Sequence, residues 1–525
     1  MCGIAASFGG QRTSHRDVVL RLLARIAHRG EADKQYELSE GNGYALGANR
    51  LAILSDPQEA QPRRSRDALL ECVYNGEVYN YRQLFQNVVG GSEATIPDVD
   101  TDCLLETLRF GGADVIRLLD GMFALIWIDH RSGSAFAARD RLGIKPLFYA
   151  QTKHAFLLGS EIKALAPEDD VTQIEEVVPG TILTIRNGSG TVTSIITAKH
   201  YFDLGQSERR AVTAPQLRDS LSEAVRMECD YSRPIGVYLS GGVDSTGIYA
   251  LARLASDNVV PLILSSESGS DGPVALRVVR ELGGEPVVGV CPSEEALFAD
   301  IEHTIEVCES FEPNVVRHSA IQMHIAHLAV SAGVKVVLCG EGADELFCGY
   351  SEFWESSQWL ELRIQFLRDL HRTQLRRVDR CSMAVTTEVR VPYLSNDVVS
   401  LALAIKDRSQ LFRDRANKLL LREALQGVVP EWVRWRPKIV LSEGAGLPGS
   451  HPTRGMFYRL AEGRMTESDY RDISAAYPEW QLETREEAFY FSVFQRLGFT
   501  KARFMSKRIR ATRMSSLQNG ELPTA

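Results

Sequence analysis

The sequence predicts a protein of two structural domains: an N-terminal α+β domain built on antiparallel sheets, and a C-terminal α/β domain in which a parallel sheet with flanking helices is followed by a helical region. Two observations predict this division. Short strand-like runs separated by turn residues fill roughly the first 200 residues, whereas strand-like and helix-like segments alternate after residue 205. The total of 525 residues agrees with two or three domains at about 100–200 residues each.

The strand-like runs of the first half are short and apolar, and residues that favour turns stand between them. Helices are expected at 17–27 and 101–110, and Asn75-Gly76 is one of the expected turns. The expected strands lie at 44–48, 69–74, 122–128, 134–138, 147–149, 155–158 and 181–185.

The second half reads as βαβ units, which predict a parallel sheet. A boundary in the polar stretch 204–213 gives domains 1–205 and 206–505, and we expect 506–525 to form a flexible tail. Residues 351–507 read mostly as helix. The alternating segments are strands at 234–239, 259–264 and 334–338 and helices at 245–254, 273–282 and 318–332.

Composition excludes several classes of function. The chain has 59 Lys and Arg against 68 Asp and Glu, which disfavours nucleic-acid binding because that function needs a basic face. No apolar run approaches the ~18 residues that span a bilayer, and the stretch 4–8 is too short for a secretory signal. The nine cysteines are dispersed, as in a protein with reduced thiols. We therefore expect a cytoplasmic protein that binds neither nucleic acid nor membranes.

Cys2 is set apart from the other cysteines by its position. A small residue in second place normally permits removal of the initiator Met, which would leave a thiol and a free α-amine on one residue. The amine has a pKa of about 7.7–8.0 and can take the thiol proton near neutral pH. Cys2 is therefore a candidate nucleophile that carries its own base.

A series of motifs follows Cys2 in order. It comprises His28-Arg-Gly30, Arg50-Leu-Ala-Ile53, Gln61-Pro62, Asn75-Gly-Glu-Val-Tyr-Asn80, Thr101-Asp102, Asp120-Gly-Met-Phe-Ala124, Ala138-Arg-Asp-Arg-Leu-Gly-Ile-Lys-Pro-Leu147 and Gly159-Ser-Glu-Ile-Lys-Ala164. The series resembles the class II glutamine amidotransferase domain, whose nucleophile is an N-terminal Cys. The resemblance implies a sandwich of antiparallel sheets of the Ntn-hydrolase type, with glutamine as substrate.

The resemblance implies a role for each matching residue. Cys2 attacks the side-chain amide of glutamine, and Asn75 with the backbone N–H of Gly76 forms the oxyanion hole. Arg50 binds the α-carboxylate through its forked guanidinium, and two acids bind the α-ammonium group. The implied glutamine-binding residues are Arg50, Asn75, Glu77 and Asp102.

The motif Ser240-Gly-Gly-Val-Asp-Ser245 lies between a strand-like and a helix-like segment. Its glycines let backbone N–H groups approach a phosphate, and the start of the helix adds positive potential. The motif resembles the pyrophosphate loop of ATP pyrophosphatases, and a second Gly turn carries Gly340-Glu-Gly-Ala-Asp-Glu345. The implied ATP site comprises Leu239, Ser240, Gly241, Gly242, Asp244, Ser245, Gly340 and Glu341.

Asp244 and Asp344 follow two strands of the expected parallel sheet. They should meet at the carboxyl ends of those strands, where ligands bind in such sheets. Two carboxylates together with phosphate oxygens suit Mg²⁺, which would neutralise a departing pyrophosphate. We therefore expect Mg²⁺ as cofactor and ATP as a substrate.

Over most of residues 1–445 the ordered motifs resemble the glutamine-dependent asparagine synthetase family. The resemblance implies two half-reactions. Cys2 releases ammonia from glutamine, and ammonia attacks an acyl-adenylate made from ATP and a carboxylic acid, which gives an amide, AMP and pyrophosphate. Lys438 and Glu341 match catalytic positions of the family. Because free ammonia is mostly protonated in neutral water, a water-poor channel between the domains is favoured.

The acceptor acid stays open in the sequence. Aspartate, giving asparagine, is the first expectation, but segments 262–271, 286–290 and 439–446 depart from the family pattern, so an acid of a specialised biosynthetic route is an alternative. A catalytically silent paralogue that only binds ligands is a second alternative. Arg317 and Asp379 are the candidates for acceptor binding, and the alternative role of Arg317 is an ion pair at a helix start. The expected partners are glutamine, ATP and the acid, and a homodimer is left open.

Overall fold

The protein is described here from a computed structural model. The structure describes residues 2–505 with the exception of 11–13, 32–36, 54–60, 91–94, 187–193, 207–209, 230–232, 414–415, 440 and 448–454. The tail expected at 506–525 lies outside the described residues.

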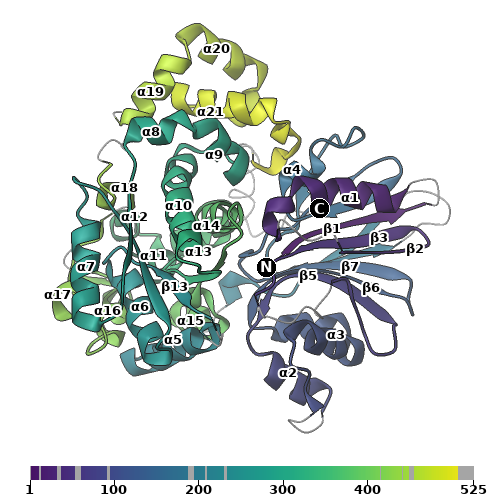
Figure 1. Cartoon of the computed structure of the whole chain (residues 1–525), viewed down its shortest axis with the longest axis horizontal. Helices are drawn as coiled ribbons and strands as arrows, with labels where there is room; N and C mark the ends of the chain where they lie inside the picture. Colours follow the sequence, from purple (N-terminus) through teal and green to yellow (C-terminus); the bar gives the residue numbers. More distant parts are fainter. Residues whose placement is uncertain are drawn as a thin grey trace.

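Two six-stranded antiparallel sheets form the N-terminal half (Figure 1). The first has the strand order β10-β8-β9-β1-β3-β2, and the second has the order β12-β11-β7-β6-β5-β4. The strands are β1 Cys2–Gly9, β2 Glu37–Gly41, β3 Tyr44–Arg50, β4 Arg63–Arg64, β5 Leu70–Val78, β6 Gly121–Asp129, β7 Ser134–Arg139, β8 Phe148–Gln151, β9 Ala155–Gly159, β10 Glu175–Glu176, β11 Thr181–Arg186 and β12 Ser194–His200. The α-helices are α1 His15–Arg25, α2 Tyr81–Val88, α3 Asp100–Gly111 and α4 Ile162–Leu165.

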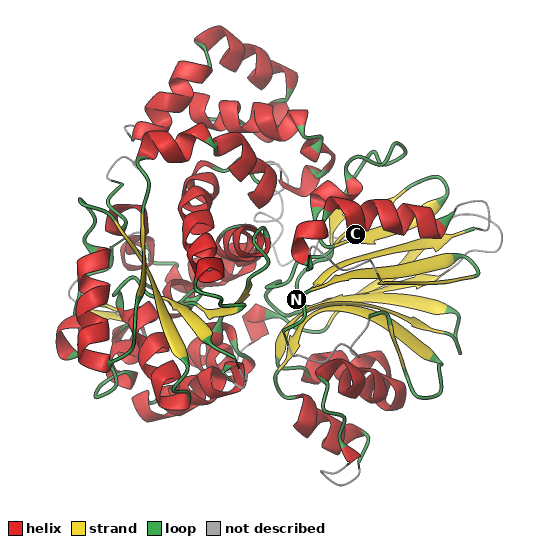
Figure 2. Ribbon diagram, in the orientation of Figure 1, coloured by secondary structure: helices red, strands yellow, loops and turns green. Residues whose placement is uncertain are grey.

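The alternation of side chains along the strands explains how these sheets pack. Ile4 and Phe8 of β1 share one core with Ile126 of the second sheet, whereas Ala5 points the other way and packs with residues of α1 such as Val19. Helix α3 packs on the outer face of the second sheet. The layers are therefore helix, sheet, sheet and helix (Figure 2).

A five-stranded parallel sheet with the order β15-β14-β13-β16-β17 forms the centre of the C-terminal half. Its strands are β13 Ile235–Tyr238, β14 Val259–Ser265, β15 Val287–Val290, β16 Val336–Leu338 and β17 Glu388–Arg390. Most helices of this half follow or flank these strands: α5 Ala214–Glu228, α6 Val243–Ala255, α7 Asp271–Leu282, α8 Glu294–Ala299, α9 Ile301–Cys308, α10 Pro313–Ser331, α11 Ala343–Phe347, α12 Ser351–Glu355, α13 Trp359–Asp369, α14 Gln374–Met383, α15 Asn396–Ala404, α16 Leu419–Ala424, α17 Glu431–Arg434 and α18 Leu441–Gly444. A two-stranded sheet, β18 Phe412–Arg413 with β19 Ala416–Asn417, stands apart from the central sheet.

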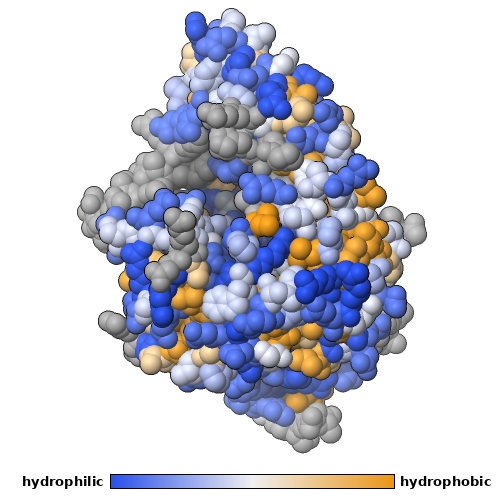
Figure 3. Space-filling model, turned by 90° about the vertical axis from the view of Figure 1, so that its left-hand side faces the viewer, coloured by the Kyte–Doolittle hydropathy of each residue, from blue (hydrophilic) through white to orange (hydrophobic). Residues whose placement is uncertain are grey.

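The last three described α-helices form a helical region at one end of the C-terminal half (Figure 1), in which α19 packs against α8, α21 packs against α9, and α20 packs against α21. They are α19 Met456–Arg464, α20 Glu467–Ala476 and α21 Arg485–Arg496. Its core is aromatic, with the rings of Phe311, Trp480 and Phe491 at centroid distances of 5.1–5.5 Å. Within the described part of the chain, no helix combines the length and apolarity needed to cross a bilayer. The face of the C-terminal half in Figure 3 is mostly hydrophilic, and its apolar residues form scattered patches.

The structure confirms the fold class that the sequence predicts, with antiparallel sheets in the first half and a parallel sheet with helices in the second. The turn expected at Asn75-Gly76 is wrong. Both residues lie inside β5, and Gly76 pairs with Phe123 of β6. The long β5–β6 pairing overrides the local turn preference of Asn-Gly.

Candidate active sites

The first candidate site lies at the start of β1, where Cys2 is paired with Arg50 of β3 in the antiparallel register. Both side chains are buried. They line a small cavity of about 50 Å³, whose other residues are Leu51, Ile53, Gln61, Arg63, Tyr74, Gly76, Glu77, Val99, Asp100 and Thr101. Strand pairing thus brings the expected nucleophile and the expected carboxylate-binding arginine together.

Asn75 and Gly76 of β5 stand directly beside Cys2. The backbone N–H of Cys2 donates a hydrogen bond to Asn75 Oδ1 at 3.1 Å, which fixes the orientation of the amide. Asn75 Nδ2 is buried and has no hydrogen-bond partner among the described residues. Gly76 has no room for a side chain, because a Cβ there would lie 2.0 Å from the carbonyl oxygen of Met122. An unpaired buried donor beside a thiol suits the negative oxygen of a tetrahedral intermediate.

Glu77 and Asp100 are acids of the same cavity. Burial raises the pKa of Glu77 to about 8, although Arg390 lies 3.5 Å away and acts in the opposite direction. Burial also raises the pKa of Asp100. A cationic group brought in by a ligand would favour the ionised form of both acids. The pair is therefore suited to an ammonium group.

The structure corrects the expected position of Asp102. Its carboxylate does not line the cavity but forms a two-point ion pair with Arg63, with Nε–Oδ1 and Nη2–Oδ2 distances of 2.8 and 2.5 Å. Asp100, two residues earlier, lies in the cavity instead. Arg63 lines the cavity and is paired with Asp102, so the contribution of Asp102 to the cavity is to hold Arg63 in place.

Gln61 is a residue of this site for which the motif series gave no role. Its Nε2 lies 3.7 Å from the Sγ of Cys2, and its Oε1 accepts a hydrogen bond from the backbone N–H of Tyr74 at 2.7 Å. The only signal in the sequence is that Gln61-Pro62 belongs to the matching series.

The second candidate site lies at the carboxyl ends of β13 and β16. Gly241, in the loop before α6, has a φ of +76°, a conformation that glycine adopts without strain. The hydroxyl oxygens of Ser240 and Ser245 lie 3.0 Å apart and close the loop. Gly340 permits a close approach of β16 to α6, because a Cβ there would lie 3.1 Å from the nitrogen of Ser245. The glycines therefore expose backbone N–H groups at the start of α6.

This loop borders a cavity of about 370 Å³. Apolar side chains such as Leu264, Ile325 and Leu441 form part of its wall. Asp344 and Lys438 also line it. Among the residues expected to bind ATP, the following line the cavity: Leu239, Ser240, Gly242, Asp244, Ser245, Gly340 and Glu341.

Lys418 joins the two acids that were expected to bind a metal. Its Nζ lies 2.5 Å from Asp244 Oδ2 and 2.5 Å from Asp344 Oδ1, and Lys438 pairs with the other oxygen of Asp344. Although burial acts to raise it, these two ammonium groups hold the pKa of Asp344 well below its usual range. Asp244 and Asp344 therefore meet as the sequence predicted, but with a lysine between them.

Four cationic residues of this cavity were not among the candidates: Arg377, Lys418, Arg422 and Arg436. Lys418 has a φ of +54°, unusual for a residue with a side chain, and it immediately precedes α16. Arg377 of α14 pairs with Glu341 at 2.5 Å. Nothing in the sequence indicates which acid Lys418 or Arg377 will pair with.

Arg317 does not reach the cavity, which corrects its assignment as an acceptor-binding residue. The side chain is 2% exposed, and its Nε donates to Oε1 of Glu486 on α21 at 2.8 Å. The hydroxyl of Tyr490 donates to the same oxygen at 2.9 Å. The ion-pair alternative is thus the one that the structure shows.

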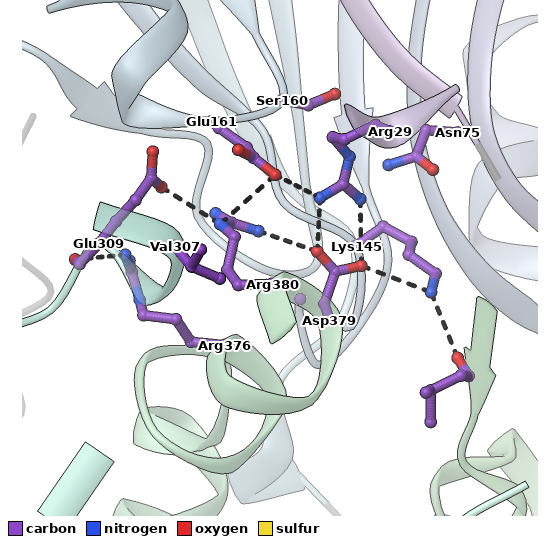
Figure 4. A network of polar contacts seen from close by, with 12 residues as sticks. Arg29, Asn75, Lys145, Ser160, Glu161, Val307, Glu309, Arg376, Asp379 and Arg380 are labelled. Atoms are coloured by element: carbon purple, nitrogen blue, oxygen red, sulfur yellow. Dashed lines mark hydrogen bonds and ion pairs between the residues drawn. The ribbon is translucent and has the colours of Figure 1, made fainter. Parts of the chain in front are cut away.

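Asp379 is likewise not in the cavity but in a buried network between the two halves of the chain (Figure 4). It accepts hydrogen bonds from Arg29 at 2.9 and 3.2 Å and from Arg380 at 2.9 Å, and it lies 3.7 Å from the Nζ of Lys145. Against the effect of burial, these cations lower the pKa of Asp379 to about 2. Asp379 therefore lies outside the cavity and is paired with the cations of this network, a position that does not fit the expected binding of an acceptor.

The same network reaches the first site. Arg29 also pairs with Glu161 at 2.6 Å, and its Nε donates to the carbonyl oxygen of Cys2 at 3.4 Å. Nearby, the cavity residues Leu51 and Ile53 form an apolar cluster with Val336 of β16 and Met383 of α14. Charged and apolar contacts thus join the first cavity to β16 and α14 of the C-terminal half.

Comparison with known proteins gives the family of each half of the chain. Residues 1–198 match the model of the glutamine amidotransferase domain, and residues 216–365 and 352–496 match that of asparagine synthase. A probable glutamine-hydrolysing asparagine synthetase of Acanthamoeba polyphaga mimivirus is 28% identical, over 94% of each chain. The asparagine synthetase of Gallus gallus is 30% identical over 85% of this chain and 84% of its own. A solved structure of the allosteric regulatory enzyme of purine biosynthesis is 16% identical and covers 55% of this chain and 80% of its own with a TM-score of 0.29, too low to support an argument.

The chain therefore combines a glutamine amidotransferase domain with an asparagine synthase domain. It belongs to the asparagine synthase family.

Proposed function

We propose that the protein is a glutamine-hydrolysing, ATP-dependent amide synthetase that converts aspartate to asparagine. The observation that carries this proposal is the presence of two sites in one chain: Cys2 beside the unpaired amide donor of Asn75, and a phosphate-type loop at a cavity of about 370 Å³. The names of the relatives support the same reaction.

In the first half-reaction, Cys2 Sγ attacks the side-chain carbonyl carbon of glutamine. Asn75 Nδ2 and the backbone N–H of Gly76 donate hydrogen bonds to the oxyanion, ammonia leaves, and water then releases glutamate from the thioester. Once Met1 is removed, the α-amine of Cys2 takes the thiol proton and delivers it to the leaving ammonia.

Binding of glutamine in this cavity uses its two charged groups. Arg50 suits the α-carboxylate because a guanidinium forms two parallel hydrogen bonds with it. Glu77 and Asp100 suit the α-ammonium group, which supplies the cation that these buried acids need.

In the second half-reaction, an acceptor carboxylate oxygen attacks the α-phosphorus of ATP and the bond to the β-phosphate oxygen breaks. Lys418 and Lys438 lie where they can balance the charge of the phosphates. Ammonia then attacks the acyl carbon, loses a proton, and AMP leaves with its oxygen.

The residues present fit Mg²⁺ as an additional partner of the phosphates. Asp244 Oδ1 is buried and has no hydrogen-bond partner among the described residues. In that part of the chain no cluster of three or more His, Cys, Asp or Glu side chains is suited to hold a metal by itself. Asp244 and Asp344 would therefore hold the ion together with phosphate oxygens, and the ion would neutralise the departing pyrophosphate.

Pyrophosphate release tests the function directly. Wild-type protein with glutamine, Mg-ATP and a panel of carboxylic acids should release pyrophosphate with aspartate. Release with a different acid only would reassign the acceptor, and no release with any acid would leave a ligand-binding paralogue. Cys2→Ala should lose the use of glutamine and keep synthesis from added ammonia, and full glutaminase activity in this variant would contradict the nucleophile.

A further inference from the structure

Three polar side chains of α10, those of Asn314, His318 and Gln322, line the ATP cavity and have no role in the chemistry described above. Val315, His318, Ile321, Gln322 and Ile325 recur at helical spacing and all line the cavity, so one face of the helix forms its wall. His318 and Gln322 lie one turn apart in the middle of this face. This pair stands among the apolar residues Val315, Ile321 and Ile325, and a polar pair in such a place points to a polar ligand group.

Gln322 is only 5% exposed, and the orientation of its amide is fixed. Its Oε1 accepts a hydrogen bond from Arg377 at 3.3 Å, and because a guanidinium can only donate, the oxygen must face it. Nε2 has no hydrogen-bond partner of proper geometry among the described residues, although the Tyr238 hydroxyl lies beside it. A buried donor without a partner costs free energy that a ligand oxygen would recover.

His318 is partly buried and forms no hydrogen bond or ion pair with the residues that the structure describes. Burial and the positive charges of Arg377, Arg317 and Lys438 lower the pKa of His318 to about 3, so the imidazole is neutral. A neutral imidazole donates through its N–H, as Gln322 does through Nε2. The environment of the pair therefore suits a group with negative oxygens.

The groups that suit the phosphates of ATP are the loop from Ser240 to Ser245 and Lys418. Among the described residues, neither Gln322 nor His318 forms a hydrogen bond with these groups. Gln322 is also unsuited to pair with adenine through both amide atoms, because Arg377 occupies its oxygen. What remains is the acceptor. Arg377 joins Gln322 to Glu341, which follows Gly340 beside the phosphate loop, so the pair and the loop belong to one cavity.

We propose that Gln322 and His318 bind the carboxylate of the acceptor that does not react, and that they make the enzyme select dicarboxylic over monocarboxylic acids. This inference rests on the proposed amide synthetase function. It adds to that function two specificity-determining residues on α10, one donating through Nε2 and the other through an imidazole N–H.

Matched acids test the proposal. Aspartate and β-alanine share the reacting carboxylate and the amine, but β-alanine lacks the second carboxylate, and succinate and propionate form a similar pair. We would measure kcat/KM from pyrophosphate release with added ammonia and saturating Mg-ATP. The variants are Gln322→Glu, which keeps an oxygen for Arg377 but removes the donor, and His318→Ala. His327→Ala, an exposed histidine of the same helix outside the cavity, is the control.

Wild type and His327→Ala should prefer the dicarboxylic acid of each pair. Each of the two variants should lower that preference by about tenfold or more, because a hydrogen bond to a charged group is lost, while the KM for ATP stays within about twofold. An unchanged preference, or a rise in the KM for ATP alone, overturns the subsite and leaves the proposed function standing. If the wild-type protein releases pyrophosphate with none of the acids, both the subsite and the proposed function are overturned.

Discussion

Replacing Asp379 by Asn tests whether the buried network of Figure 4 holds the two halves of the protein together. The side chain is 4% exposed and faces three cations, Arg29, Arg380 and Lys145. Asn keeps the size of the side chain but removes its negative charge. Three buried cations then share the remaining acids of the network.

The structure gives the size of the effect in two ways. The pKa of Asp379 is lowered to about 2 from 3.8, which corresponds to about 2–3 kcal/mol of favourable interaction. Breaking a buried ion pair by removing one partner typically costs about 3–5 kcal/mol. Because most partners lie across the domain boundary, we expect the docked arrangement to lose at least about 2 kcal/mol, a factor of about 30 in its equilibrium constant.

Two measurements check this expectation. Thermal unfolding of Asp379→Asn should begin at a lower temperature than that of wild type and separate into two transitions. The ratio of glutamate formed to pyrophosphate released should rise above the wild-type value as ammonia escapes, while synthesis from added ammonia remains. Asp472→Asn, at an exposed acid of α20, is the control. A single transition at the wild-type midpoint with a wild-type ratio would refute the reasoning.

Acid sensitivity follows from the same group. The folded pKa of Asp379 is depressed, so its contribution is complete above the unfolded value of about 3.9 and is lost as the pH falls toward 2. Asp379→Asn should therefore lose less stability than wild type over that interval. An equal loss in both proteins would contradict the assignment.

Four further changes have defined outcomes. Asn75→Ala removes the unpaired donor and should lower the kcat for glutamine hydrolysis by about 10²–10³, and a loss below tenfold would contradict its oxyanion role. Glu77 must ionise to bind the α-ammonium group, so the KM for glutamine should fall as the pH rises from 6 toward 8, and Glu77→Gln should abolish this dependence. In the absence of ligand, the raised pKa of Glu77 should make the free energy of unfolding decrease as the pH rises from about 4.5 to 8. Lys418→Met leaves two adjacent carboxylates without their shared cation and should raise the KM for ATP about tenfold or more, measured by pyrophosphate release. Arg317→Met leaves Glu486 buried without its cation and should cost about 3–5 kcal/mol in denaturant unfolding, whereas adding Glu486→Leu should recover most of it.

Much of the fold and several residues of the two candidate sites could be predicted because they depend on local patterns. Apolar periodicity predicted the antiparallel sheets before residue 205 and the parallel sheet after it. The position of Cys2 and the glycine loop at 240–245 predicted a nucleophile and a phosphate-type turn, since a strand followed by a glycine turn and a helix exposes its backbone N–H groups wherever it occurs. The prediction of a turn at Asn75-Gly76 was wrong because strand pairing over the length of β5 outweighs the local turn preference of these two residues.

The sequence by itself determined the architecture and the loop that faces the second cavity, because these follow from side-chain spacing and backbone freedom within short segments. Only the tertiary structure decided which charged residues meet. Arg29 pairs with Asp379, 350 positions further along the chain, and Arg317 pairs with Glu486. Asp100 rather than Asp102 lines the cavity of Cys2. The physical reason is that a buried charge is tolerated only beside a partner of opposite charge, and folding brings that partner from a distant segment.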